Sequence, residues 1–166
     1  KEDIKRYYET GVPTLQMNLE VWDERLFNII CPGKANAVGR DKFIRQMIDA
    51  VDIFGRGRIL SNFVLGVEMA QPWGFKDPKA AVKSTLAGWE YLMSHDVLPR
   101  MEMWCIEEGS ALAGQKPPPL EYYIEVERGY LELRQKYNFP FPYPAYCRSC
   151  YLVDTVADWD YYYWGK

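Results

Sequence analysis

The sequence predicts an α/β fold in which consecutive βα units build a parallel sheet, and three observations support this. Segments with strand character, near 14–20, 58–66 and 98–105, alternate with longer segments that have helical periodicity. The return connections at 55–58 and 95–97 are short, as is usual between a helix and the next strand of a βαβ unit. Hydrophobic residues make up 48% of the 166 residues and charged residues 26%, which favours a packed core.

The helices are predicted from apolar residues at helical spacing and from residues that favour helix ends. In "RDKFIRQMIDAVDIFG", Asp41 is expected to cap the start of the helix and Gly55 to end it. In "DPKAAVKSTLAGWEYLMSH", Asp77 is the expected cap and Pro78 fits the first turn. The segments with helical character are 1–10, 23–30, 40–55, 77–95 and 120–138.

The connections that leave the C-terminal ends of the three strands are long and rich in Gly and Pro. They span 31–40, 67–77 and 105–120, and we expect all three to be loops. Active sites of α/β barrels lie on the face that carries such loops. The loop-rich face is therefore where we expect the functional residues.

The strands carry polar side chains on one face, which is unusual for a parallel sheet covered by helices on both sides. In the first strand Gln16, Asn18 and Glu20 alternate with apolar residues. In the second strand Asn62, Val64 and Gly66 share a face, and in the third strand Arg100, Glu102 and Trp104 do so. One interpretation is a barrel whose inner face binds a polar ligand. The alternative is a set of edge strands with one wet face.

The barrel interpretation predicts half of a (β/α)6 TIM-like partial barrel, because three strands cannot close a barrel. Residues 1–138 would form three βα units, and residues 139–166 would form a C-terminal tail rich in Pro and aromatic residues. The second half of the barrel is then an expected partner, on the same or a separate chain. The chain begins at Lys1 instead of Met, so we expect a partial chain.

Composition disfavours several other classes of protein. The net charge is −3 and the basic residues are scattered among acids, so we expect no nucleic-acid partner. No apolar run approaches the roughly 18 residues of a membrane span, and no secretory signal is visible. We therefore expect a cytoplasmic protein without a membrane partner. A small-molecule substrate fits a polar barrel interior.

The four cysteines suggest a metal site without defining one. Cys147 and Cys150 form a CxxC, which is half of a zinc or iron–sulfur signature. Cys31 and Cys105 follow the first and third strands and would complete a four-ligand site if the tail reached them. The alternative is that all four are reduced thiols, with Cys31 and Cys105 acting as small hydrophobic residues.

An ordered set of motifs resembles the second half of a radical S-adenosylmethionine enzyme, nearest the biotin-synthase-like group. The set covers most of residues 12–115: a strand ending in Glu20, the Pro32–Gly33 turn, Arg40 opening a helix, and the segments "VLGVE" and "EEGSALAG". The CxxxCxxC loop that binds the 4Fe-4S cluster in this family is absent. The resemblance thus implies strands four to six of a six-strand part-barrel, with the cluster bound by a loop outside this chain.

The resemblance also implies roles for individual residues, although it identifies no catalytic residue. Asn18 and Glu20 would face the ribose or amino group of S-adenosylmethionine, and Arg40 would pair with its carboxylate. Asn62, Val64 and Gly66 would lie near its adenine or methionine portion, and Arg100, Glu102 and Trp104 would face the substrate. A second, auxiliary cluster or a zinc ion would be bound at Cys147 and Cys150.

Three other hypotheses remain open. The chain is alternatively a fragment of an unrelated α/β-barrel lyase, although no Lys lies on the polar strand faces to form a Schiff base. It is alternatively a non-catalytic subunit that contributes half a barrel to a partner, or a small metal-binding module built on the four cysteines. In the leading hypothesis the chain belongs to an enzyme but is inactive alone.

Overall fold

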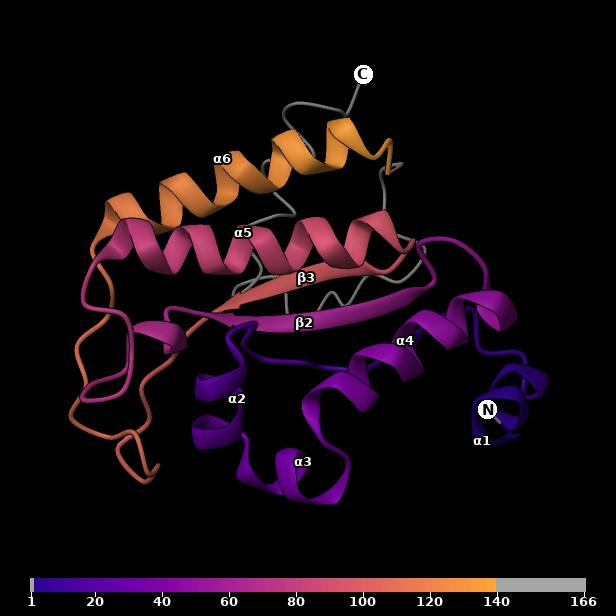
Figure 1. Cartoon of the computed structure of the whole chain (residues 1–166), viewed down its shortest axis with the longest axis horizontal. Helices are drawn as coiled ribbons and strands as arrows, with labels where there is room; N and C mark the ends of the chain where they lie inside the picture. Colours follow the sequence, from indigo (N-terminus) through magenta and orange to yellow (C-terminus); the bar gives the residue numbers. More distant parts are fainter. Residues whose placement is uncertain (1, 140–166) are drawn as a thin grey trace.

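The computed structural model describes residues 2–139, and these form an α/β domain with a central parallel sheet (Figure 1). The elements are α1 (Glu2–Glu9), β1 (Leu15–Gln16), α2 (Glu24–Ile30), α3 (Pro32–Ala37), α4 (Arg40–Phe54), β2 (Ile59–Leu65), the 3₁₀ helix η1 (Val67–Met69), α5 (Pro78–Ser94), β3 (Leu98–Met103) and α6 (Leu120–Lys136). The predicted alternation of strands and helices is confirmed. Most of the predicted tail lies outside the described residues.

The three strands are parallel and adjacent in chain order, β1-β2-β3. Gln16 lies opposite Leu60, and Leu60 lies opposite Leu98. Further along the sheet Asn62 lies opposite Arg100. Because directly paired residues point to the same side of a sheet, these residues share one face.

The other face of the sheet packs against the helix layer. The Phe63 ring meets Trp89 of α5 edge-on, with ring centroids 5.8 Å apart, and Trp89 meets Tyr130 of α6 at 5.1 Å. The Tyr130 hydroxyl donates a hydrogen bond of 2.8 Å to the carbonyl of Pro99, on β3. Helices α5 and α6 run side by side along this face (Figure 1). A fully buried aromatic column therefore joins the sheet to both helices.

Arg56 links three segments of the chain near the N-terminal ends of β2 and β3. Arg56, between α4 and β2, donates from Nε to Asp96 at 2.7 Å and from Nη1 to the carbonyl of Asn138 at 3.0 Å. It also donates to the carbonyl of Tyr137, and its guanidinium lies 4.3 Å from the centre of the Phe139 ring. The end of α6 is thereby fastened to two turns that enter strands.

Two local predictions are wrong. The first strand does not run from 14 to 20, because β1 covers only Leu15–Gln16 and pairing resumes as an isolated bridge at Glu20. The segment 31–40 is not a loop throughout, because it contains α3, which begins at Pro32. Proline suits the first turn of a helix, and the alanines and the lysine that follow favour its continuation.

The described part of the chain confirms a parallel α/β architecture with an open three-stranded sheet. Half of a barrel remains a prediction, since an open sheet of three strands does not by itself distinguish a part-barrel from other parallel sheets. Within residues 2–139, no helix combines the length and apolarity that crossing a membrane requires.

Candidate functional site

The end of β1 is interrupted by a one-residue bulge. The backbone N–H of Met17 donates to the carbonyl of Leu60 at 2.8 Å, and the next ladder bond runs from Glu20, not from residue 19, to Asn62 at 3.0 Å. The N–H of the extra residue, Leu19, donates instead to the side-chain oxygen of Ser61 at 3.2 Å. A buried serine hydroxyl thus replaces the carbonyl that the ladder lacks at this point.

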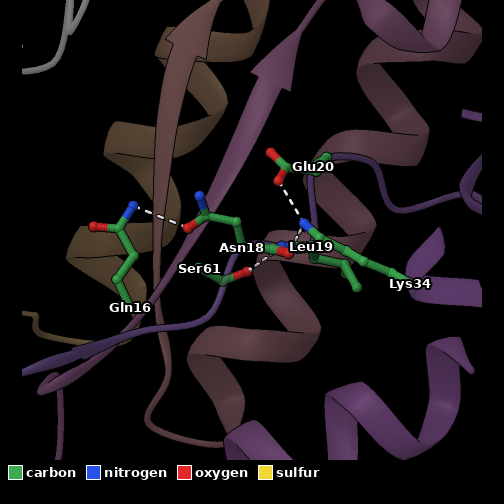
Figure 2. Close-up of polar contacts among 6 residues, drawn as sticks. All are labelled: Gln16, Asn18, Leu19, Glu20, Lys34 and Ser61. Atoms are coloured by element: carbon green, nitrogen blue, oxygen red, sulfur yellow. Dashed lines mark hydrogen bonds and ion pairs between the residues drawn. The ribbon is translucent and has the colours of Figure 1, made fainter. Parts of the chain in front are cut away.

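The bulge places Glu20 in an unusual conformation and breaks the alternation predicted for this strand. Glu20 has φ of 73°, in the left-handed region that few residues other than glycine adopt. Gln16 and Asn18 do lie on the same side, and the amide of Gln16 donates to Oδ1 of Asn18 at 2.9 Å (Figure 2). Glu20 pairs with Phe63, so it does not continue the Gln16–Asn18 row. The prediction that all three share one strand face is wrong for Glu20.

Glu20 points instead toward Lys34 of α3 (Figure 2). The Lys34 ammonium donates to Oε1 of Glu20 at 2.5 Å and to the backbone carbonyl of Asn18 at 2.7 Å. The side chains of Lys34 and Glu20 are 35% and 23% exposed, so the pair is partly shielded from water. Lys34 is not among the predicted site residues, because the sequence of the segment that carries it predicts a loop.

Asn62 and Arg100 occupy neighbouring positions on the sheet face that points away from α5. Both are buried, with 3% and 7% of their surface exposed. The side-chain Oδ1 of Asn62 is buried and has no hydrogen-bond partner among the residues that the structure describes. A buried carbonyl oxygen without a donor is unfavourable, so a ligand with an N–H or O–H group would stabilise it.

The turn after β2 is organised by a buried carboxylate, Glu68 of η1. Its oxygens accept hydrogen bonds from the hydroxyl of Thr85 at 2.7 Å, from the hydroxyl of Tyr122, and from the backbone N–H of Gly66 at 3.0 Å. Burial raises the pKa of Glu68, although these donors oppose the shift. Burial and the nearby Glu68 carboxylate also raise the pKa of Tyr122.

Gly66, which the sequence places near the ligand, occupies a position in this turn that requires glycine. Its φ is 102°, and a Cβ placed there would lie 2.6 Å from Cγ of Pro118. Val64 is partly buried on the strand before it. The motif "VLGVE" contains Glu68 but does not reveal its role, because the burial of Glu68 depends on contacts from Thr85 of α5 and Tyr122 of α6.

Arg40 lies at the first position of α4 and packs against the segment that follows β1. Its Nε donates to the carbonyl of Trp22 at 2.9 Å, and Nη1 lies 3.0 Å from the carboxylate of Asp41. The guanidinium also lies 4.3 Å from the centre of the Trp22 ring, which in turn packs against Gly88 of α5. Arg40 therefore has a structural role at the contact between α4 and the segment that follows β1.

The remaining expected site residues are placed as follows. Glu102 lies opposite Val64 and is partly buried, so it belongs to the same face as Asn62 and Arg100. Trp104 lies just beyond β3, where its backbone N–H donates to the carbonyl of Leu65 at 3.0 Å. Its side chain is partly buried and packs against the core.

The expected metal ligands fall partly outside the described residues. Cys147 and Cys150 lie beyond residue 139. Cys31 is half-buried and Cys105 is exposed, and both are free thiols. Burial raises the pKa of the Cys31 thiol, and the nearby Lys34 partly offsets this shift. Within residues 2–139 no three His, Cys, Asp or Glu side chains gather as a metal site would require.

A separate groove of ≈1200 Å³ runs between α5 and α6. Its lining combines apolar residues such as Val82, Leu86 and Leu133 with charged residues such as Lys83 and Glu125. It lies in the helix layer and includes none of the polar strand residues.

Comparison with known proteins gives one distant similarity. The chain is 26% identical over 144 residues to the bacteriochlorophyllide c C-7(1)-hydroxylase of Chlorobaculum limnaeum. The match covers 86% of this chain but only 33% of the hydroxylase, so the chain spans about a third of the length of that protein. No protein-family model and no solved structure matches the chain.

Proposed function

We propose that this chain is the C-terminal part of a radical S-adenosylmethionine enzyme and that it binds the cofactor and a small-molecule substrate inside a part-barrel. The observation that carries the proposal is the polar site at the ends of β1 and β2. Asn18 and Glu20 supply an amide and a carboxylate at the end of β1, and on β2 the buried Oδ1 of Asn62 has no partner within the described residues.

The distant similarity to the hydroxylase supports the same function. Hydroxylation of a carbon atom requires a C–H bond to be broken, which is a step suited to radical chemistry. The similarity provides a link to the radical S-adenosylmethionine enzymes that is separate from the short motifs read in the sequence. The substrate of that hydroxylase is not carried over to this chain, because the match covers only a third of the hydroxylase.

The residues present fit part of what the cofactor requires. S-adenosylmethionine bound with its 4Fe-4S cluster supplies a carbon-centred radical that removes hydrogen from a substrate. Within residues 2–139 no set of cluster ligands is present. In this proposal the cluster would be bound by a loop outside this chain. Glu20 would accept hydrogen bonds from cofactor hydroxyl or amino groups, and the amide nitrogen of Asn18 would donate one to a cofactor hydroxyl oxygen. Asn62 would accept a hydrogen bond through Oδ1, and Arg40 would bind a carboxylate.

The open edge of β1 supports an N-terminal half-barrel as the partner. Leu15 and Met17 donate their N–H groups to β2, so the N–H of Gln16, between them, points to the outer edge. In the described sheet no strand pairs with that edge. An exposed parallel edge is normally paired or covered, and a further parallel strand would fit here.

A titration of the full-length protein with S-adenosylmethionine tests the proposal. We expect Asn62→Leu to weaken binding by roughly tenfold, because the buried acceptor and its ligand bond are lost together. Asn28→Leu, an exposed asparagine on α2, is the matched control and should leave the affinity unchanged. Lack of binding by the wild-type protein, or equal affinity in the wild-type and Asn62→Leu proteins, would refute this assignment.

A further inference from the structure

Lys34 is the residue of this site that neither the sequence motifs nor the comparison points to. It lies in the short helix α3, whose sequence PGKANA was expected to be a loop. Its ammonium nevertheless reaches the end of β1 and forms two close hydrogen bonds there, to the Asn18 carbonyl and to Glu20 Oε1 (Figure 2). Lys34 thus connects the two residues that the proposed function places against the cofactor.

These two bonds hold a backbone segment that is unfavourable on its own. Glu20 adopts a left-handed φ of 73°, and Leu19 donates to Ser61 in place of a ladder carbonyl. The Asn18 carbonyl lies at the bulge, where the regular strand pairing is interrupted. By donating to this carbonyl and to the carboxylate together, Lys34 stabilises the turn in a single arrangement.

The same bonds leave one carboxylate oxygen of Glu20 available to accept hydrogen bonds from a ligand. Lys34 binds Oε1, whereas Oε2 has no hydrogen-bond partner among residues 2–139. The amide nitrogen of Asn18 also has none there, since its Oδ1 is the atom that Gln16 contacts. An oriented carboxylate oxygen with free acceptor capacity is suited to a ligand hydroxyl group, and the Asn18 amide, two residues away along the chain, is a further donor.

We propose that Lys34 is a positioning residue that orients Glu20 for recognition of the two ribose hydroxyl groups of an adenosyl ligand. The inference rests on the proposed function and deepens it. Lys34 does not contact the ligand; it fixes one carboxylate oxygen so that the other accepts from a hydroxyl group. Its contribution to affinity therefore depends on the hydroxyl groups being present.

The test compares two probes on the full-length protein: S-adenosylhomocysteine and its 2′,3′-dideoxyribose analogue. We expect Lys34→Met to weaken the first by about tenfold and the second by less than about twofold, so the ratio of the two dissociation constants falls. Lys34→Arg, which keeps the charge, should restore most of the ratio. Lys42→Met, the same change at an exposed lysine of α4, should have no effect.

The outcomes separate this inference from the function on which it rests. If the wild-type protein binds neither probe, both are overturned. If the wild-type protein binds and discriminates but Lys34→Met weakens both probes equally, Lys34 has only a structural role and the inference alone is overturned. If thermal denaturation shows that Lys34→Met is unfolded, Lys34→Gln, which keeps a donor for the Asn18 carbonyl, replaces it with the same expected ratio.

Discussion

The replacement of Tyr122 by Phe tests how the buried carboxylate of Glu68 is stabilised. Glu68 is 3% exposed and has three hydrogen-bond donors, of which the Tyr122 hydroxyl is one. Removing this hydroxyl leaves a buried oxygen with one donor fewer, which should cost about 1–3 kcal/mol of unfolding free energy. For a domain of this size, that loss corresponds to a fall in Tm of roughly 2–12 °C.

The assay is thermal and urea denaturation of Tyr122→Phe beside Tyr7→Phe. Tyr7 lies on α1 and is 57% exposed, so loss of its hydroxyl should change stability by less than about 0.5 kcal/mol. Thr85→Val removes the donor at 2.7 Å and should have an effect of similar size to Tyr122→Phe. An unchanged Tm for both Tyr122→Phe and Thr85→Val would refute the reasoning, because it would mean that water or another group satisfies the carboxylate.

Three further predictions follow from the same structure. Because burial raises the pKa of Glu68 above its ordinary 4.5, the folded state retains this proton at higher pH than the unfolded state. Stability should therefore fall as the pH rises from about 4.5 through the raised pKa, and Glu68→Gln, followed by denaturation across this pH range, should abolish that component. A pH dependence identical to that of the wild type would contradict it. Gly66→Ala should destabilise by about 1–3 kcal/mol in a urea titration, since φ is positive and the new Cβ would meet Pro118; a neutral effect would show that the turn relaxes freely. Arg40→Ala should weaken S-adenosylmethionine binding to the full-length protein by roughly 1.5–3 kcal/mol, measured by calorimetry, and a lowered Tm with unchanged affinity would assign Arg40 to packing alone.

The fold was predictable from the sequence because its signals are local and repeated. Helices α4 and α5 have apolar residues at helical spacing, the segment of β2 lies between them, and that of β3 follows α5. Asp77 caps α5 as predicted, whereas the residue before α4 is Gly39 and Asp41 lies inside that helix. The face assignment of β2 and β3 follows from period-two alternation, and the register confirms that Asn62 and Arg100 share a face. Neither inference requires knowledge of distant contacts.

The parts that were missed depend on contacts between distant segments. At the bulge, the N–H of Leu19 donates to the hydroxyl of Ser61, which is 42 residues away along the chain. The pairing of Lys34 with Glu20 requires α3 to form and to lie beside β1. Glu68 is buried and hydrogen-bonded only because Thr85 of α5 and Tyr122 of α6 lie next to it in the folded chain. Such contacts leave no periodic trace in the sequence.

The extra residue at the end of β1 lets this segment bury an apolar side chain and present polar side chains independently. In an uninterrupted strand, strict alternation would link the two. Leu19 is completely buried, while Asn18 and Glu20 on either side of it are only partly buried. The side chains at positions 18 and 20 are thereby freed from the strict alternation that the interior imposes. Substitutions at positions 18 and 20 that change ligand preference should consequently leave the packing of the core intact. Deletion of one residue from this segment should disrupt that packing.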